Sequence, residues 1–397
     1  MLLLSKSRGL MRHIALILFI LTISFSGLNG QTGSDTSSKA GVLSLRIKSL
    51  TFVRDDEYFN SIGSSKFVLV SSLPGFTDKS KWIEGYTLIG YFFQPELVYN
   101  PSDRVTLRAG AYLLKYSGKD KFTKALPVFS TSFKINGNTT LVMGTLPGCD
   151  SHKLYDPLFD HERLYKNYYE EGFQVTGNYR RIFNDTYVSW ENFIFSNDTT
   201  REIINFGESF RYSFPEIAGF IHPSVPVQVQ FKHFGGQISN YPEHMETYFN
   251  MMAGLGCNFD IAGKKYGEAG IEALGFLNRE FPGKPPSGIT RGSAIWIKGN
   301  YIYKSIHFGA SYWKGHNFFA PDGNPVYGSV KNHTSDYVIP DREIINNTLY
   351  IDLFPENFLD LFLGAETYYD VRMKTLDYAF TLHLNLDKLI KLARLKQ

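Results

Sequence analysis

The sequence predicts an all-β protein, a transmembrane antiparallel up-and-down β-barrel of about sixteen strands, within a range of about 14–18. Three observations lead to this fold class. Many stretches of the chain alternate apolar and polar residues. The links between these stretches alternate in length. The N-terminus has a basic, then apolar, then small-residue order that is typical of exported proteins.

The alternation has a period of two residues. In the first stretch Leu43, Leu45 and Ile47 share one face, and polar residues occupy the other. Such a pattern over about ten residues indicates a strand with one apolar face, and it matches the length of a tilted membrane-spanning strand. The strands are expected at 42–53, 84–99, 103–116, 125–135, 139–146, 172–183, 186–196, 202–214, 225–236, 249–261, 266–278, 292–303, 306–315, 343–354, 358–370 and 375–386.

The links separate into two classes. Tight-turn compositions occur at 100–103, 136–138, 184–185, 262–265, 304–305 and 355–357. Between them lie longer links at 54–83, 117–124, 147–171, 237–248, 279–291 and 316–342. A barrel with short periplasmic turns and long extracellular loops has this rhythm, whereas a soluble sandwich gives no reason for it. An even strand count then places both termini on the periplasmic side.

The chain is divided as follows. Residues 1–30 are expected to be a signal peptide, because Lys6, Arg8 and Arg12 precede the apolar run Ile14–Ile23. That run is too short for a transmembrane helix, which disfavours an uncleaved anchor. Residues 31–41 form a polar segment, and 42–386 form the barrel. Residues 387–397 are a basic periplasmic tail, either a short helix or a frayed end. Cleavage after Ser26 and after Gly30 are both open.

Composition excludes several classes of protein. The 41 basic side chains against 38 acidic ones disfavour a generic polyanion binder, so we expect no nucleic-acid partner. The two cysteines, Cys149 and Cys257, exclude a small disulfide scaffold, and whether they pair is open. Aromatic residues make up 16%, and many lie near strand ends, which predicts belts at both membrane–water boundaries. The alternative is an aromatic core inside a soluble protein.

Several short motifs resemble a family of outer-membrane β-barrel proteins of Bacteroidetes-type bacteria. They are Asp56-Glu-Tyr-Phe-Asn60, Glu84-Gly-Tyr-Thr-Leu88, Gly144-Thr-Leu-Pro-Gly148, His152-Lys-Leu-Tyr-Asp-Pro-Leu-Phe-Asp-His-Glu-Arg-Leu164 and Glu170-Glu-Gly-Phe-Gln174. The resemblance implies an outer-membrane location and a barrel fold, and it implies no particular substrate. The chain departs from many outer-membrane barrels because it lacks a terminal aromatic residue.

A barrel of about sixteen strands leaves an aqueous lumen. The first functional hypothesis is therefore a porin-like channel for passive diffusion of small hydrophilic solutes, constricted by an inward-folded acidic loop, 147–171. The candidate constriction acids are Asp150, Asp156, Asp160, Glu162, Glu170 and Glu171. The candidate basic residues of the pore wall are Arg46, Lys48, Arg104, Arg108 and Arg180. Opposed charged rows would select solutes by charge. Two alternatives are open: the groups pair and close the bore, or they face solvent unrelated to each other.

Three alternatives compete with the open channel. A plugged barrel would serve surface binding, adhesion or assembly through loops 54–83 and 316–342. A barrel enzyme would need an Asp/His or Ser/His pair within hydrogen-bond reach at the rim, and the sequence holds no Gly-x-Ser-x-Gly elbow, so a non-enzyme is expected. The Asp and His residues of 147–171 match no defined metal motif, so neither metal nor cofactor is expected.

The expected partners follow from the location. They are outer-membrane lipid and lipopolysaccharide, small hydrophilic solutes and the barrel-assembly machinery, with a homo-oligomer as an open possibility.

Overall fold

A computed structural model describes residues 39–59, 85–236, 245–281, 285, 287–331, 337–354 and 359–395. The expected signal peptide, most of the polar segment after it and most of the 54–83 link lie outside these residues. Within the described part of the chain, no helix has the length and apolar character needed to cross a membrane.

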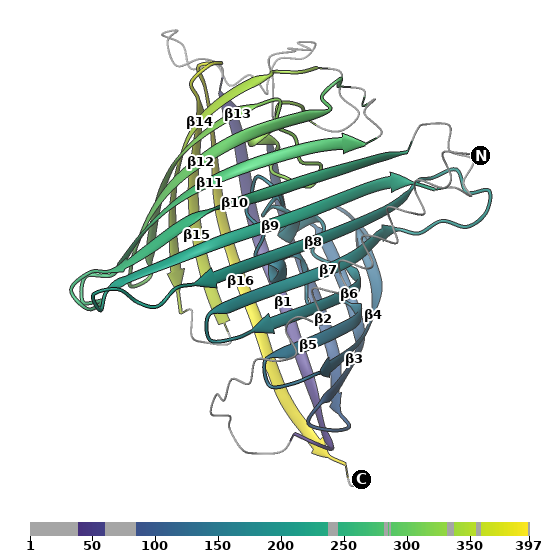
Figure 1. Ribbon diagram of the computed structural model, residues 1–397. Helices are drawn as coiled ribbons and strands as arrows, with labels where there is room; N and C mark the ends of the chain where they lie inside the picture. Colours follow the sequence, from purple (N-terminus) through teal and green to yellow (C-terminus); the bar gives the residue numbers. More distant parts are fainter. Residues whose placement is uncertain are drawn as a thin grey trace. The chain divides into compact units, whose positions relative to one another are not determined.

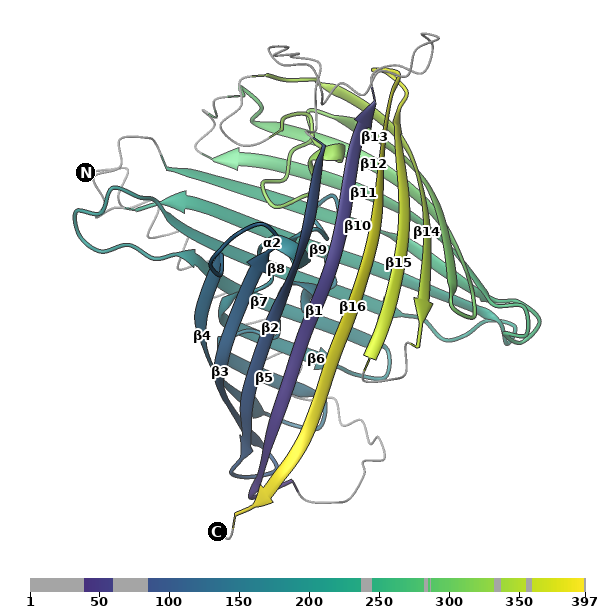
Figure 2. The same ribbon diagram turned by 180° about the vertical axis from the view of Figure 1, so that it is seen from behind.

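Sixteen antiparallel strands close into one barrel (Figure 1). Each strand pairs with its neighbours in sequence, and β1 pairs with β16 to complete the ring (Figure 2). Val42 pairs with Arg394, so the first strand begins and the last strand ends at the same end of the barrel. The strands are β1 (Val42–Phe59), β2 (Tyr86–Asn100), β3 (Val105–Tyr116), β4 (Lys124–Lys134), β5 (Thr139–Thr145), β6 (Glu171–Asn178), β7 (Ile182–Asn192), β8 (Glu202–Ser213), β9 (Ile221–Gly235), β10 (Glu246–Asp260), β11 (Glu268–Phe281), β12 (Arg291–Tyr303), β13 (Ile306–His316), β14 (Asp341–Leu353), β15 (Leu359–Asp370) and β16 (Thr375–Arg394).

The alternation in the sequence becomes an apolar outer face. On β2 the side chains of Ile89, Tyr91 and Phe93 are exposed on the outside. Phe92 between them, and Gln94 beyond them, are buried in the bore. Because the ring is closed, each strand pairs with a neighbour on both sides, and the end of β16 beyond Leu386 pairs, among the described residues, with β1 alone. The predicted transmembrane barrel and its strand number are therefore confirmed.

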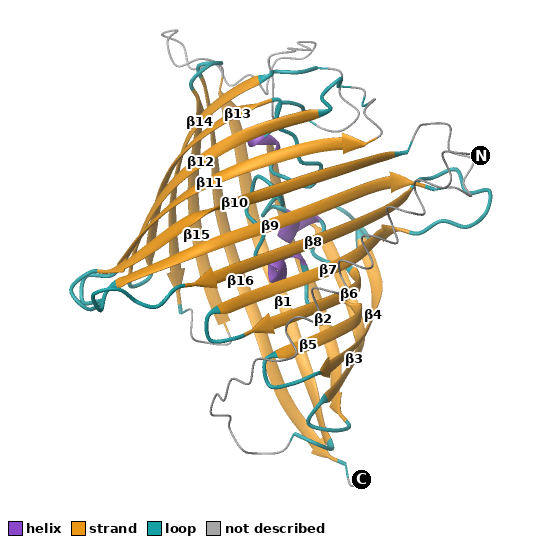
Figure 3. Ribbon diagram, viewed as in Figure 1, coloured by secondary structure: helices purple, strands orange, loops and turns teal. Residues whose placement is uncertain are grey.

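The bore contains described parts of two of the longer links. The first spans 146–170 and carries η2 (Cys149–His152) and α2 (Arg163–Lys166). The second spans 317–340 and carries η3 (Pro325–Tyr327). The short helices lie within the ring of strands (Figure 3). We call 146–170 of the first link loop A. We call 317–331 of the second link, the segment that carries η3, loop B.

An aromatic core lies inside the barrel where loop B meets the wall. Trp296, Trp313 and Phe276 point inward from β11–β13 and pack against Phe318 and Tyr327 of loop B, with ring centroids 5.0–5.8 Å apart for the closest pairs. Burying one such side chain contributes about 1.5–3 kcal/mol. This packing holds loop B within the bore.

Two details differ from the sequence predictions, and the open question of cysteine pairing is answered. The turn expected at Asn184-Asp185 lies at 179–181 instead, because the alternation continues through β7 and places Asp185 in the bore. The expected helix or frayed end after 386 is a strand as far as Arg394, where it pairs with β1. Both cysteines are free, with Cys149 buried in loop A and Cys257 on β10.

The aromatic belt is also smaller than predicted. The prediction of belts covers Tyr187, Trp313 and Tyr368, which lie near the ends of the expected strands, but each is at most 6% exposed and points into the bore. Side-chain direction depends on strand register, which nearness to a strand end does not specify.

The outer face gives a first test. Ile297 lies mid-strand on β12 and is 46% exposed on the outside. Replacement by Arg would place a charge against the lipid acyl chains, and we expect a loss of about 2–4 kcal/mol in unfolding free energy. The measurement is the urea midpoint of the heat-modifiable folded form in lipid vesicles. Asn300→Arg on the same strand, which faces the bore cavity, is the matched control and should change the midpoint little.

Candidate functional site

Loop A contacts the barrel wall on several sides. Glu162 accepts a hydrogen bond from Arg54 of β1 at 2.9 Å. The Tyr155 backbone N–H donates to Gln228 of β9 at 2.8 Å, and the Tyr165 hydroxyl lies 3.4 Å from His383 of β16. Since β1 and β16 lie opposite β9 in the ring, loop A crosses the bore.

Loop A and loop B are bound to each other and to the same wall. Arg163 of loop A makes ion pairs with Asp322 of loop B at 2.9 Å and with Glu191 of β7 at 2.8 Å. Asp322 also pairs with Lys232 of β9 at 2.9 Å and accepts from the Asn205 amide at 2.9 Å. This buried network neutralises two cations with two carboxylates and joins both loops to the wall.

A second buried network surrounds Arg54. Its guanidinium donates to Glu162 at 2.9 Å, to Glu366 of β15 at 3.0 Å and to the Thr381 hydroxyl at 2.8 Å. Arg54 is 2% exposed, so these partners replace the water that the charge loses. The strand expected to end at 53 continues through Arg54, and for that reason the sequence analysis missed this residue.

His152 forms the third network at the base of loop A. Its Nε2 lies 2.8 Å from Glu170, its Nδ1 lies 2.9 Å from Asp185, and its ring stacks on Tyr187 at 3.5 Å. Burial acts to lower the pKa of His152, but attraction to Glu170 and hydrogen bonds to Asp185 and Glu170 raise it to about 9. The imidazolium thus links loop A to β7.

The six predicted constriction acids have different surroundings. Asp156, Asp160, Glu162 and Glu170 lie in loop A within the bore, whereas Asp150 is exposed. Glu171 begins β6 on the exposed face and hydrogen-bonds to Tyr169. Of the six, Glu162 makes an ion pair with a wall arginine, and that arginine is Arg54, which is not among the predicted wall residues.

The five predicted wall residues are likewise divided. Arg46 pairs with Asp387 at 2.6 Å, and Arg108 lies 3.6 Å from Glu96, so both have wall acids as partners. Lys48 bonds to the Tyr168 hydroxyl of loop A. Arg104 and Arg180 are exposed in turns at the short-turn end. The structure therefore does not bring the predicted acidic and basic sets together as two opposed rows.

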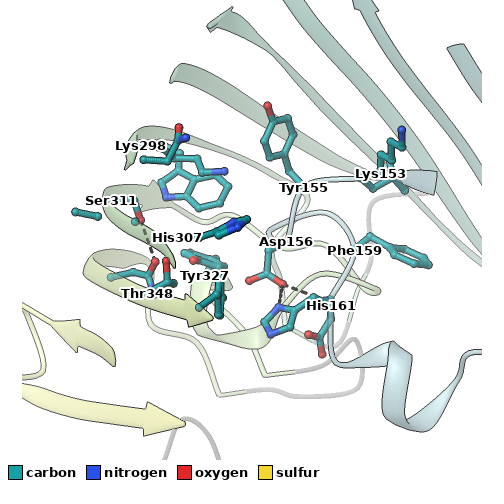
Figure 4. Close-up of a pocket in the computed structure, with 18 of the residues that line it drawn as sticks. Lys153, Tyr155, Asp156, Phe159, His161, Lys298, His307, Ser311, Tyr327 and Thr348 are labelled. Atoms are coloured by element: carbon teal, nitrogen blue, oxygen red, sulfur yellow. Dashed lines mark hydrogen bonds and ion pairs between the residues drawn. The ribbon is translucent and has the colours of Figure 1, made fainter. Parts of the chain in front are cut away.

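A cavity of about 570 Å³ remains in the bore beneath loop A (Figure 4). Tyr155, Asp156 and His161 border it from loop A, and Lys298 and Ser311 border it from the wall. Asp156, Asp160 and His161 place one ligand atom each within 4.8 Å of one another. The two Asp156 oxygens already accept hydrogen bonds, one from the His161 ring at 2.6 Å and the other from the Asn324 amide at 2.9 Å. The Asp156 carboxylate therefore has protein partners for both oxygens.

Another group of polar residues lies on the outside of the barrel. Ser293 of β12 pairs in register with His316 of β13, and His316 pairs with Asp341 of β14. All three side chains are exposed. His316 Nδ1 lies 2.8 Å from an Asp341 oxygen, and its Nε2 lies 3.2 Å from the Asn317 amide nitrogen. We call Ser293, His316 and Asp341 the outward row.

The outward row lies at the barrel end where the longer links 282–290 and 317–340 join these strands. It borders a groove of about 450 Å³ on the outer face. Small residues, Ala253 and Gly275, form the hollow, and Leu277 and Ile295 wall it. Lys314 lies on the same face of β13 as His316, two residues further from the end of the strand. An apolar groove on the outside of a transmembrane barrel faces lipid acyl chains.

A second histidine faces outward at the same end. His233 Nδ1 of β9 lies 2.8 Å from the Thr247 hydroxyl of β10. This pair has no carboxylate hydrogen-bonded to the ring among the residues described. It differs in that respect from the outward row.

Fold and site together define a class: a membrane-spanning β-barrel with filled bore and a Ser, His, Asp row on its lipid-facing surface. The model of the lipid A 3′-O-deacylase-type family matches residues 35–395, and the chain belongs to that family. No curated protein sequence matches the chain.

Solved structures share the barrel at low similarity. OprD, an outer membrane protein from Pseudomonas aeruginosa, has 10% identity and a TM-score of 0.49, covering 91% of this chain and 98% of its own. OpdL of the same species has 11% identity and a TM-score of 0.48, covering 88% and 99%. The loop L8 deletion mutant of OmpT, an outer membrane protein of Vibrio cholerae, has 9% identity and a TM-score of 0.46, covering 86% and 99%. Similarity at this level carries no argument about activity.

The expectation of a non-enzyme is wrong, because the family is one of deacylases. The sequence analysis looked for motifs that are local in the chain. The residues of the outward row lie on three strands and become neighbours only through the register, so no local motif could reveal them.

The His152 network predicts a pH dependence. An unfolded histidine has a pKa of about 6.5, so the stabilisation is complete below that pH and is lost as the pH rises through about 9. We expect the urea midpoint of the folded barrel to fall between pH 6 and pH 10. In His152→Gln this part of the pH dependence should be absent. Identical pH profiles for the two proteins would show that His152 is not charged in the folded state.

Proposed function

We propose that the protein is an outer-membrane acyl-ester hydrolase that removes an acyl chain from a lipid A-class glycolipid. The observation that carries this proposal is the outward row, with its 2.8 Å His316–Asp341 hydrogen bond, at the border of a lipid-facing groove. Family membership supplies the substrate class and the reaction.

The roles follow from the chemistry of ester hydrolysis. Asp341 accepts the Nδ1 proton of His316 and fixes the tautomer whose Nε2 is basic. Nε2 takes the Ser293 hydroxyl proton as Oγ attacks the ester carbonyl carbon. The tetrahedral intermediate collapses, the sugar hydroxyl leaves with the proton held by His316, and the acyl group remains on Ser293. Water, deprotonated by His316, then releases the fatty acid.

Asn317 lies close enough to His316 to take part in the hydrolysis. Its amide nitrogen contacts Nε2 at 3.2 Å, at the point where the serine hydroxyl must approach. For catalysis the amide has to turn away from the ring, where it becomes a donor for the oxyanion. Catalytic hydrogen bonds often form only when substrate is bound.

The position of the row suits a substrate held in a bilayer. The outer face of the barrel is apolar, and the acyl chain would lie in the groove between Leu277 and Ile295. We assign the end with the longer links to the cell surface, which places both termini in the periplasm. The resemblance to Bacteroidetes-type barrels supports an outer-membrane location, where lipopolysaccharide is the neighbouring lipid.

Substitution of the row tests the proposal. Purified wild-type protein in mixed micelles should release free fatty acid from lipid A, detected by mass spectrometry. Ser293→Ala and His316→Ala should each lower kcat by about 10³-fold or more, since the three groups act as a unit. Asp341→Asn should lower it less, because the Ser293 nucleophile and the His316 base both remain and only the group that orients the imidazole is changed.

The matched control is His233→Ala. It removes another outward-facing histidine at the same end, and activity should stay at the wild-type level. Full activity in Ser293→Ala would rule out this serine as the nucleophile. Absence of release by the wild type from any acylated glycolipid would reject the hydrolase.

A second candidate function is the porin-like channel predicted from the sequence. The plugged barrel that binds at its surface is the alternative to that channel. The location of loop A in the bore and the cavity of about 570 Å³ favour some passage for small solutes. The ion pairs Arg54–Glu162 and Arg163–Glu191, which tie loop A to the wall, favour a closed bore.

Single-channel recording in potassium chloride separates the two. A channel requires discrete ohmic steps and a change in ion selectivity for the Asp156→Asn, Asp160→Asn, Glu162→Gln variant. A folded, heat-modifiable barrel that gives no current would exclude the channel and leave the hydrolase unaffected.

A further inference from the structure

Two arginines face each other on the outer surface just beyond the outward row. Arg279 of β11 and Arg291 of β12 occupy directly paired positions, and both are exposed. The neighbouring pair on the same face is Leu277 and Ser293. Side chains at paired positions lie about 5 Å apart at Cβ, and like charges placed there repel each other.

Nothing among the described residues neutralises this pair. Arg279 lies over the Phe281 ring at 4.9 Å, and neither guanidinium forms an ion pair with a carboxylate in the described part of the chain. Glu280, next in sequence to Arg279, faces the bore and is 3% exposed. The bore shows the opposite arrangement, because Arg54, Arg163 and Arg342 each contact a carboxylate at 2.9 Å.

We infer that Arg279 and Arg291 bind a phosphate group on the head of the acylated lipid whose chain occupies the groove. This inference deepens the proposed function and rests on it for the identity of the lipid. Two guanidinium groups present parallel N–H donors that match the oxygens of one phosphate. An anion shared by both would turn their repulsion into attraction.

The spacing fits a phosphorylated sugar that carries an ester-linked chain. Arg291 precedes Ser293 by two residues on β12, which is about 7 Å along the strand. The phosphate would lie toward the cell surface, the scissile ester at Ser293, and the acyl chain toward Ala253 and Gly275. The three parts of the lipid thus follow the membrane normal in the order in which a bilayer presents them.

The apolar groove beside the two arginines favours a lipid over a free anion as the ligand. A soluble phosphate would gain from the arginines alone, whereas the lipid also buries its chain against Leu277 and Ile295. A binding preference must therefore require both the phosphate and the acyl chain.

The experiment measures binding without turnover. Full-length mature protein carrying Ser293→Ala is titrated in detergent with lipid A and, separately, with lipid A from which the phosphates have been removed. Intact complexes are counted by native mass spectrometry. We expect the phosphorylated lipid to bind about tenfold or more tightly, and Arg279→Gln with Arg291→Gln to abolish that preference. Arg180→Gln with Arg181→Gln, which removes the same charge from a turn at the other barrel end, should preserve it.

Each outcome has a distinct meaning. Equal binding of the two lipids, or a preference that survives Arg279→Gln with Arg291→Gln, would overturn the inference even if wild-type protein hydrolyses lipid A. Persistent preference without any hydrolysis by the wild type would keep the phosphate site and reject the hydrolase. Competition by inorganic phosphate as strong as that by lipid A would show an anion site and overturn the lipid assignment.

Discussion

The closed backbone hydrogen-bond ring is the constraint on which the rest of this structure depends. Once β1 pairs with β16, every strand has two partners, and every side chain of the sheet points either to lipid or to the bore. A ring of sixteen strands is too wide for wall side chains to fill. The chain therefore supplies loop A and loop B to occupy the space. Their charged groups must then be paired in the bore, as Arg54 and Arg163 are.

The same ring brings together residues that are distant in sequence. Arg54 and Glu366 are 312 residues apart and become hydrogen-bonded because β1, β16 and β15 are consecutive in the ring. Ser293, His316 and Asp341 come together in the same way on the outer face. Groups placed on paired strands are held more rigidly than groups on loops, which suits a site that must orient three side chains.

The sequence predicts the part of this structure that depends on period and composition. Leu43, Leu45 and Ile47 alternate because their strand has lipid on one side, and the number of such stretches gives the strand count. Asp185 shows the limit: Asn-Asp reads as a turn, yet the register makes it the partner of His152. The outward row lies beyond sequence reasoning for the same reason, since register rather than spacing decides which serine meets which histidine. The expectation of loop acids opposed to Arg46 and Arg108 overlooked Glu96, a nearer acid on the wall itself.

The filled bore and the outward row are two faces of the same strands. Alternation places Ala294 and Arg342 next to the row in sequence but on the inner face, and Trp313 lies on the inner face three residues before His316. Trp313 is fully buried against Phe318 of loop B. The Arg342 guanidinium binds Asp370 of β15 at 2.9 Å and the Gly328 carbonyl of loop B at 3.2 Å. Loop B therefore fixes β12, β13 and β14 from within at the level where the row lies outside. A bore filled in this way gives the proposed lipid-facing site a rigid support that the bilayer itself does not provide.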